Sequence, residues 1–176
     1  NTPLPQHQKA AKFNAYKLPR IGHFNDAFRD NIKGHTFNHR ERGLALGNFT
    51  YATIGKQLLA GSSGLTEGET DMFYHPSQSV NYIECHDNHT LWDRMLLSNG
   101  DEDEFTRQKR QMLATAMVIF SQGIPFLHCG QEFFRSKKGI ENSYNSPDYI
   151  NAIHWDEVYQ HKDSINLIKG YIKIRK

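Results

Sequence analysis

Residues 80–89 read Val80-Asn81-Tyr82-Ile83-Glu84-Cys85-His86-Asp87-Asn88-His89, and this stretch decides the fold. Residues 80–85 form a short run with β-branched and aromatic side chains that leads into a polar cluster, so we predict a strand there. Residues 86–89 bring a carboxylate, an amide and two imidazoles to the end of that strand. This cluster is either the rim of a site for a polar ligand or a turn, because Asp and Asn also favour turns.

A long helix is predicted downstream, over residues 103–122. Its apolar side chains recur with a period near 3.6, and the acidic residues 101–104 favour the helix N-terminus through the helix dipole. Gly123 is a natural residue just past a helix end, and Pro125 prevents the helix from continuing. The apolar positions are Phe105, Met112, Leu113, Ala116, Ile119 and Phe120.

A second strand and a last helix complete a repeating order. Residues 124–129 form a short, mostly apolar run that ends at Gly130-Gln131-Glu132, which suits a buried parallel strand. From Asp163 the apolar spacing indicates a last helix, and residues 20–24 suit a further short strand. The order strand, helix, strand, helix predicts an α/β fold with parallel strands and a right-handed crossover. In such sheets the chemistry lies at the carboxyl ends of the strands, where both polar clusters occur.

The composition excludes several classes of protein. The 176 residues carry 21 Lys and Arg against 19 Asp and Glu, and this balance argues against nucleic acid or a membrane as the partner. No run approaches the ~18 apolar residues of a membrane span. Two cysteines cannot build a disulfide scaffold. The length suits one domain, but Asn1-Thr2-Pro3-Leu4-Pro5 does not look like a natural start, so we expect a piece of a longer protein.

A metal site built from Cys and His is not expected. Cys85-His86 and His128-Cys129 mirror each other at two strand ends, and His35 and His39 have helical spacing. Successive strand residues point to opposite faces, so each Cys-His pair offers one inward ligand. Structural zinc usually uses a C-x-x-C pair, which the chain lacks. We therefore predict no metal and two reduced, buried thiols.

The carboxylates near the strand ends suit a sugar hydrolase without singling out its residues. A retaining glycosidase needs two carboxyl groups about 5 to 5.5 Å apart, and pattern alone selects Asp87 with Glu132. Each of them could equally be a surface or ion-paired acid. The aromatic residues after the strand ends either stack on sugar rings or belong to the core. The other carboxylates are Glu84 and Asp93, and the aromatic residues are Trp92, Phe133, Phe134, Tyr144 and Trp155.

Four stretches, taken in order, resemble the α-amylase superfamily (glycoside hydrolase family 13) in its pullulanase form. Residues 80–93 resemble the fourth conserved region of that superfamily, and residues 121–133 resemble its eighth strand and the loop that follows. Residues 142–151, followed by Trp155, resemble the type I pullulanase loop after that strand. Residues 23–30 look like the sixth-strand region.

This resemblance implies the architecture and the reaction. It implies that residues 1–176 are the C-terminal part of a catalytic (β/α)8 barrel, about strands six to eight with their helices, with no separate second domain. Such a barrel takes about 250 residues, so the rest of the barrel is an expected partner. The implied reaction is retaining hydrolysis of α-1,6 branch linkages in an α-glucan polysaccharide such as pullulan, glycogen or starch.

The resemblance also implies roles for individual residues. Asp87 matches the third carboxylate of the family, which binds sugar hydroxyls, helps to distort the ring and stabilises the transition state. His86 matches a residue that hydrogen-bonds the sugar in the subsite where cleavage occurs. The nucleophilic Asp and the acid/base Glu of the family would both precede Asn1, so the pair of Asp87 with Glu132 is set aside and the chain alone is expected to be inactive. By position, the expected rim contacts are Asn88, Arg135, Asn142 and Tyr144.

Two alternatives to this function stay open. One is another debranching or branching enzyme of the same superfamily, and the other is a non-catalytic carbohydrate-binding or scaffold domain. No cofactor is expected in this chain. Many relatives of amylase bind calcium, but no oxygen-ligand loop is recognisable here, so calcium stays open for the parent enzyme. The resemblance is compatible with both a bacterial cytoplasmic and a secreted enzyme.

Overall fold

The computed structural model describes residues 3–63 and 72–176, and its fold is α/β. Three short parallel strands form one sheet in the order β1-β2-β3. Strand β1 is His23–Phe24, β2 is Ser79–Asn81 and β3 is Ile124–Pro125. The three predicted strands and their parallel sense are therefore confirmed, although each is shorter than predicted. The paired residues are His23 with Ser79, Phe24 with Val80, Val80 with Ile124, and Asn81 with Pro125.

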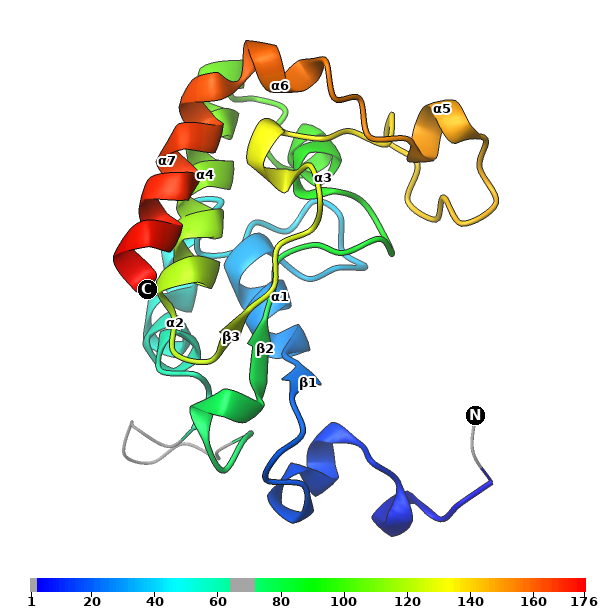
Figure 1. The fold of residues 1–176 in the computed structure, drawn as a ribbon, viewed down its shortest axis with the longest axis vertical. Helices are drawn as coiled ribbons and strands as arrows, with labels where there is room; N and C mark the ends of the chain where they lie inside the picture. The colour runs from blue at the N-terminus through cyan, green and yellow to red at the C-terminus, as the bar shows by residue number, and fades with distance from the viewer. Residues whose placement is uncertain (1–2, 64–71) are drawn as a thin grey trace.

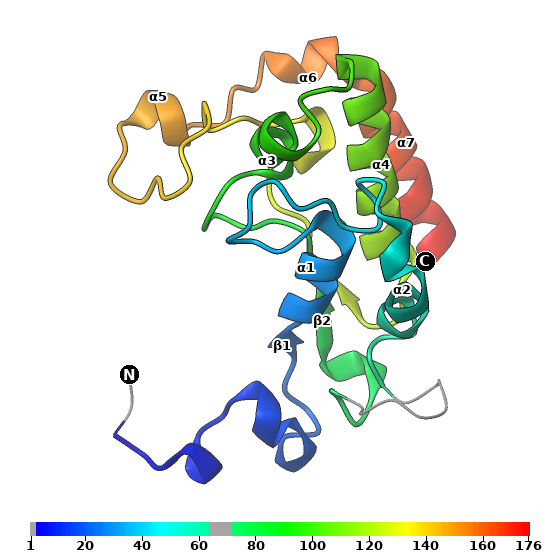
Figure 2. The same cartoon turned by 180° about the vertical axis from the view of Figure 1, so that it is seen from behind.

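Helices pack beside this sheet, and the two longest lie side by side with α7 outside α4 (Figure 1, Figure 2). The strands and these two helices run in opposite directions along the molecule (Figure 1). The α-helices are α1 Asp26–Lys33, α2 Ala52–Leu59, α3 Leu91–Ser98, α4 Glu104–Phe120, α5 Asp148–Asn151, α6 Glu157–Gln160 and α7 Lys162–Arg175. The 3-10 helices are η1 Gln6–Gln8, η2 Lys12–Lys17, η3 Phe49–Tyr51, η4 Pro76–Gln78 and η5 Gln131–Phe133.

Backbone hydrogen bonds join β2 and β3 over only a few residues. Beyond them, side-chain contacts hold the two segments together. The N–H of Phe126 donates to the carbonyl oxygen of Asn81 at 2.9 Å. Further along, the side chain of Glu84 meets that of His128 in the same register. The segments after β2 and β3 therefore stay alongside each other as they leave the sheet, and they carry the polar clusters with them.

Helix α4 confirms the predicted long helix, and its ends follow the predicted physics. The Asp103 carboxylate accepts a hydrogen bond from the N–H of Thr106 at 2.6 Å, so Asp103 caps the first turn. After the helix, Gly123 adopts a φ of 109°, where an added Cβ would lie 2.7 Å from the carbonyl oxygen of Ser79. A glycine is thus required where the chain turns from α4 into β3.

Helix α3 is absent from the sequence-based prediction. It spans only eight residues between the polar cluster and α4. The Thr90 hydroxyl accepts from the N–H of Asp93 at 3.2 Å and caps it. The crossover from β2 to β3 therefore contains two helices instead of one.

One buried apolar cluster joins helices α1, α2, α3 and α4 to the segment after β2, and a second joins α4 to α7 and to Phe134. Lys33, the last residue of α1, is only 2% exposed. Burial, followed by the nearby charge of Arg29, lowers the pKa of Lys33 to about 8. The first cluster contains Phe28, Ile32, Ala45, Leu46, Leu58, Ile83, Leu91, Met95, Ala114 and Val118, and the second contains Met112, Ile119, Phe134 and Ile168.

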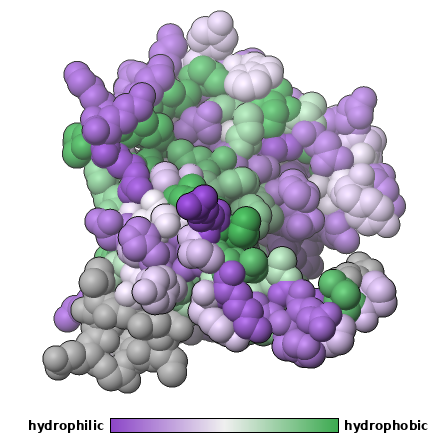
Figure 3. Space-filling view, turned by 60° about the horizontal axis from the view of Figure 1, so that its bottom comes forward, coloured by the Kyte–Doolittle hydropathy of each residue, from purple (hydrophilic) through white to green (hydrophobic). Residues whose placement is uncertain are grey.

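Apolar side chains on the sheet remain uncovered. Phe24 from β1 packs edge-on against Tyr82 and Phe126, with ring centroids 5.0 and 5.3 Å away, yet Phe24 is 48% exposed and Ile124 of β3 is 44% exposed. Within residues 3–63 and 72–176, neither β1 nor β3 has a partner on its outer edge. Figure 3 shows apolar side chains gathering near the centre of the lower face of the molecule. No helix among these described residues has the length and apolar character to cross a membrane.

Candidate functional site

Five of the six side chains predicted for the site line one cavity of about 160 Å³ at the carboxyl ends of β2 and β3. The sixth, Asn88, lines a neighbouring cleft together with Asp87 and Asn142. Three loops therefore bring the predicted residues together, although their roles stay predictions. The cavity is lined by His86, Asp87, His128, Arg135, Lys137, Asn142, Ser143, Tyr144 and Asn151.

Asp87 and His86 are presented to solvent at the mouth of the cavity. The side chain of Asp87 is 67% exposed and that of His86 is 86% exposed. His86 Nε2 lies 3.4 Å from Asp87 Oδ1. Asn88, the next residue, has a φ of 59°, a left-handed conformation that Asn tolerates better than most residues. The tight turn thus leaves the Asp87 carboxylate free to bind a ligand.

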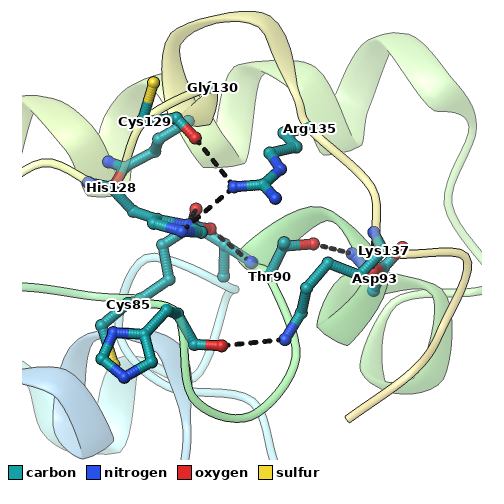
Figure 4. Close-up of polar contacts among 12 residues, drawn as sticks. Cys85, Thr90, Asp93, His128, Cys129, Gly130, Arg135 and Lys137 are labelled. Carbon is teal, nitrogen blue, oxygen red and sulfur yellow. Dashed lines mark hydrogen bonds and ion pairs between the residues drawn. The ribbon is translucent and has the colours of Figure 1, made fainter. Parts of the chain in front are cut away.

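The buried ammonium group of Lys137 binds the backbone of the turn over residues 86–88. Lys137 is 1% exposed, and its Nζ donates to the carbonyl oxygens of His86 at 3.1 Å and Asn88 at 2.5 Å. It also donates to the carbonyl oxygen of Glu141 at 3.1 Å. Burial lowers the pKa of Lys137. Lys137 therefore links the loop that carries Asp87 to the loop that precedes Asn142, as Figure 4 shows in part.

His128 and Arg135 line the cavity and contact each other (Figure 4), and a buried carboxylate extends this contact into a chain of three groups. Glu84 Oε1 lies 2.9 Å from His128 Nδ1, and His128 Nε2 lies 3.3 Å from Arg135 Nη1. Because guanidinium only donates, Nε2 is the acceptor, and Nδ1 donates to the carboxylate. Arg135 also donates to the carbonyl oxygen of Asn151 at 2.6 Å. Gly130 has a φ of 92° and an added Cβ there would lie 2.7 Å from Cβ of Arg135, so this glycine gives Arg135 its place.

The loop over residues 142–151 closes one side of the cavity. The Asn151 amide donates to the carbonyl oxygens of Ser143 at 2.7 Å and Ser146 at 3.0 Å, which fixes the curve of the loop. Ser143 is buried, whereas Tyr144 is 82% exposed. The Tyr144 ring is thus available to a ligand entering the cavity.

The pair that pattern alone selects, Asp87 with Glu132, is not brought together in one cavity. The Glu132 carboxylate accepts from the N–H of Gly130 at 3.0 Å, and Glu132 lines a different cavity beside α7. Asp93 is also structural, because it is 2% exposed and accepts from Ser136 Oγ at 2.6 Å and from the Lys137 N–H at 2.7 Å.

The aromatic residues divide between core and surface. Trp92 packs against Phe134 with centroids 5.3 Å apart, and Phe133 is 1% exposed. Tyr144 and Trp155 are exposed. Of this group, Tyr144 alone lines the cavity.

Sequence reasoning missed several residues that build the site. Lys137, Ser143 and Asn151 act through contacts with distant backbone, which no local pattern reveals. His128 was considered only as a metal ligand, yet its position after β3 in the register of Glu84 could have indicated the contact. The two thiols are free, as predicted. They are not buried, because both cysteines lie beyond the strand ends: Cys129 is exposed and Cys85 is half-buried.

Comparison with known proteins supports a single family. No protein-family model matches the chain. The chain is 47% identical over 175 residues to a pullulanase of Bacillus subtilis, covering 99% of this chain and 24% of the relative. It is 34% identical over 137 residues to the chloroplastic pullulanase 1 of Arabidopsis thaliana, covering 74% of this chain and 14% of the relative.

Comparison with solved structures leads to the same family of proteins as the sequence comparison. The type I pullulanase of Bacillus subtilis complexed with maltose matches with a TM-score of 0.96 and 47% identity, over 99% of this chain and 24% of that one. A pullulanase from Anoxybacillus sp. LM18-11 complexed with maltotriose matches with a TM-score of 0.93 and 51% identity, over 99% and 24%. The chain thus spans about a quarter of the length of these relatives.

Proposed function

The chain belongs to the type I pullulanases of the α-amylase superfamily, and from this we propose that its polar cavity is the glucan-binding part of a debranching active site. The proposed reaction is retaining hydrolysis of α-1,6 branch linkages in pullulan, glycogen or starch. The observation that carries the proposal is the exposed carboxylate of Asp87, held on a rigid turn at the carboxyl end of β2. This is where chemistry lies in barrels of parallel strands.

In this proposal the 176 residues form about strands six to eight of a (β/α)8 barrel. Among the residues that the structure describes, the outer edges of β1 and β3 have no partner, which supports the proposal because an open sheet edge is normally covered or paired. Phe24 and Ile124 are half-exposed, which supports the proposal as well. Further strands of the barrel would bury these apolar side chains. The rest of the barrel is then the main partner of this chain.

The proposed catalytic roles follow from the chemistry of retaining glycoside hydrolysis. This reaction needs a nucleophile and an acid/base about 5 to 5.5 Å apart. Among the described residues, no other carboxylate lines the cavity of about 160 Å³ with Asp87, and Glu141, which shares the neighbouring cleft, lies 3.4 Å from His39 Nε2. We assign Asp87 to the binding of sugar hydroxyls and the stabilisation of positive charge at the reacting carbon. The nucleophile and the acid/base would come from the part of the barrel outside these 176 residues.

The remaining residues of the cavity would bind and orient the sugar. His86 is exposed beside Asp87 and can hydrogen-bond the same glucose unit. Arg135, Asn142 and Asn88 offer donors around the cavity and its neighbouring cleft, and Tyr144 offers a ring face. Relatives complexed with maltose and maltotriose support an α-glucan as the ligand.

The sharpest test replaces the matching quarter of the Bacillus subtilis pullulanase with this chain. The identity of 47% and the TM-score of 0.96 make such a chimera feasible. We expect the folded chimera to release maltotriose from pullulan and the 176-residue chain alone to release none. A folded chimera without activity would favour a non-catalytic carbohydrate-binding domain, and a different product pattern would favour another branch-acting enzyme.

A further inference from the structure

Two histidines and a glutamate from three separate loops meet behind the proposed glucan site. His39 follows α1, His89 follows β2, and Glu141 follows η5. One ligand atom from each residue lies within 4.8 Å of the other two. The His39 and His89 rings meet edge to face with centroids 4.8 Å apart, and His39 Nε2 lies 3.4 Å from Glu141 Oε1.

Each imidazole offers one nitrogen to the cluster. His89 is only 7% exposed, and its ring meets that of His39 edge to face. His39 Nε2 is buried and has no hydrogen-bond partner. Such an atom needs an explanation, because buried polar atoms are normally paired.

The backbone that carries these residues is held in place by two buried cations. Arg94, which is 1% exposed, donates to the carbonyl oxygens of His39, of Asn38 at 2.7 Å and of Glu41 at 2.7 Å. Lys137 donates to the carbonyl oxygen of Glu141. The His39 and Glu141 loops are thus positioned by backbone contacts in addition to the 3.4 Å approach of His39 Nε2 to Glu141 Oε1.

We propose that His39, His89 and Glu141 bind one divalent transition-metal ion of the zinc class, with water as the fourth ligand. Two imidazoles and a carboxylate suit zinc, whereas calcium and magnesium prefer oxygen ligands. Bonds of about 2.0 to 2.2 Å require the ligand atoms to close in by roughly 1 Å. His39 Nε2 and Glu141 Oε1 are already 3.4 Å apart, so the remaining movement brings these two atoms and His89 together, and the 38% exposed side chain of Glu141 is free to take part in it.

The ion would have a path into the site and an effect on the glucan cavity. Glu141 lines the open cleft of about 440 Å³ that Asp87 and Asn88 also line. His89 directly follows Asn88, so a metal bond to His89 would anchor the turn that presents Asp87. The site is distinct from the candidates visible in the sequence, because it joins His39 to His89 and uses neither His35 nor a cysteine.

The test titrates the metal-free 176-residue chain with Zn²⁺ and follows heat release and thermal unfolding. We expect one equivalent to bind and to raise the unfolding temperature. His39→Ala and Glu141→Gln should each weaken binding by more than about 10-fold. Glu141→Gln keeps the shape of a half-exposed side chain, so it tests the site even if His39→Ala impairs folding.

The controls separate this site from other zinc ligands. His35→Ala removes an imidazole from the same loop and should leave binding unchanged, as should the double change Cys85→Ser with Cys129→Ser. With Co²⁺, we expect the visible absorption of a tetrahedral site and no thiolate charge-transfer band. The proposal is overturned by the absence of stoichiometric binding, by binding that survives both ligand variants, or by binding that is lost with the cysteines.

Discussion

Glu84 accepts a hydrogen bond from His128 across 2.9 Å, from one strand end to the next, with the carboxylate only 1% exposed. Glu84 also accepts from the N–H of Leu91, the first residue of α3. One carboxylate therefore ties β2, β3 and the helix after the Asp87 turn together. Glu84 thus fixes the two strand ends that carry the cavity, although it does not line the cavity itself.

We expect Glu84→Gln to destabilise the chain by about 2 kcal/mol, because hydrogen bonds to a buried charged group are worth about 1.5 to 3 kcal/mol. Gln has a single accepting oxygen, and its NH2 group only donates, so either His128 or Leu91 loses its partner. Urea unfolding measures the change. Glu104→Gln removes an exposed carboxylate from α4 and should change the unfolding free energy by less than about 0.5 kcal/mol. Equal effects of the two changes would contradict the role of Glu84.

Asp87→Asn should abolish most activity without affecting folding. In the active chimera we expect kcat to fall at least about 100-fold, because a charge that stabilises the transition state is lost. Unfolding should be unchanged, since the side chain is 67% exposed. Asp101→Asn is a matched control, because its carboxylate is 68% exposed and lies on the loop before α4. A near-normal kcat for Asp87→Asn would refute the assignment.

Lys137→Met should loosen the Asp87 turn. The change leaves the carbonyl oxygens of His86, Asn88 and Glu141 without a donor, at about 1 to 3 kcal/mol for each one that stays buried. We expect lower stability of the chain and weaker glucan binding by the chimera, read from a raised KM. Lys138→Met changes the exposed neighbour and should affect neither quantity. If Lys137→Met leaves KM unaltered in a folded chimera, the turn does not depend on this ammonium group.

Local patterns explain which parts of the fold could be predicted. Helix α4 is capped by Asp103, has apolar side chains at helical spacing and ends before Gly123. All three signals come from residues that are close together in the sequence. Helix α3 spans eight residues, too few for its period to emerge beside the polar cluster that precedes it. The contacts of Lys137 depend on chain segments about 50 residues apart, which only the folded chain brings together.

The same distinction holds for the site. His86 and Asp87 could be placed at the edge of the sheet because chemistry lies at the carboxyl ends of parallel strands, whereas Asn142 and Tyr144 could be placed near them only through the resemblance to the family. The strand ends also brought Glu132 into consideration, and only the folded structure shows its carboxylate turned to the Gly130 N–H. Side-chain direction after a strand ends is therefore the information that the sequence lacks.

The buried ammonium group of Lys33 should make stability depend on pH in the alkaline range. Its pKa falls from 10.5 to about 8 on folding, chiefly through burial. Below pH 8 the lysine is charged in both states and the full cost of burying the charge opposes folding. Between about pH 8 and 10.5 the unfolded chain binds more protons than the folded one, so the free energy of unfolding rises with pH. This lowering of the Lys33 pKa corresponds to roughly 3 kcal/mol of unfolding free energy.

Lys33→Met should remove this rise and stabilise the chain at pH 7, because the methionine has no charge to bury. The difference in unfolding free energy between the two chains, measured by urea at pH 7, 8, 9 and 10, isolates Lys33 from other groups that titrate there. We expect the difference to shrink steadily as the pH increases. Lys56→Met, at an exposed position on α2, should give a difference that is constant with pH. A constant difference for Lys33→Met would mean that Lys33 keeps an ordinary pKa, and that its charge is solvated in the folded chain.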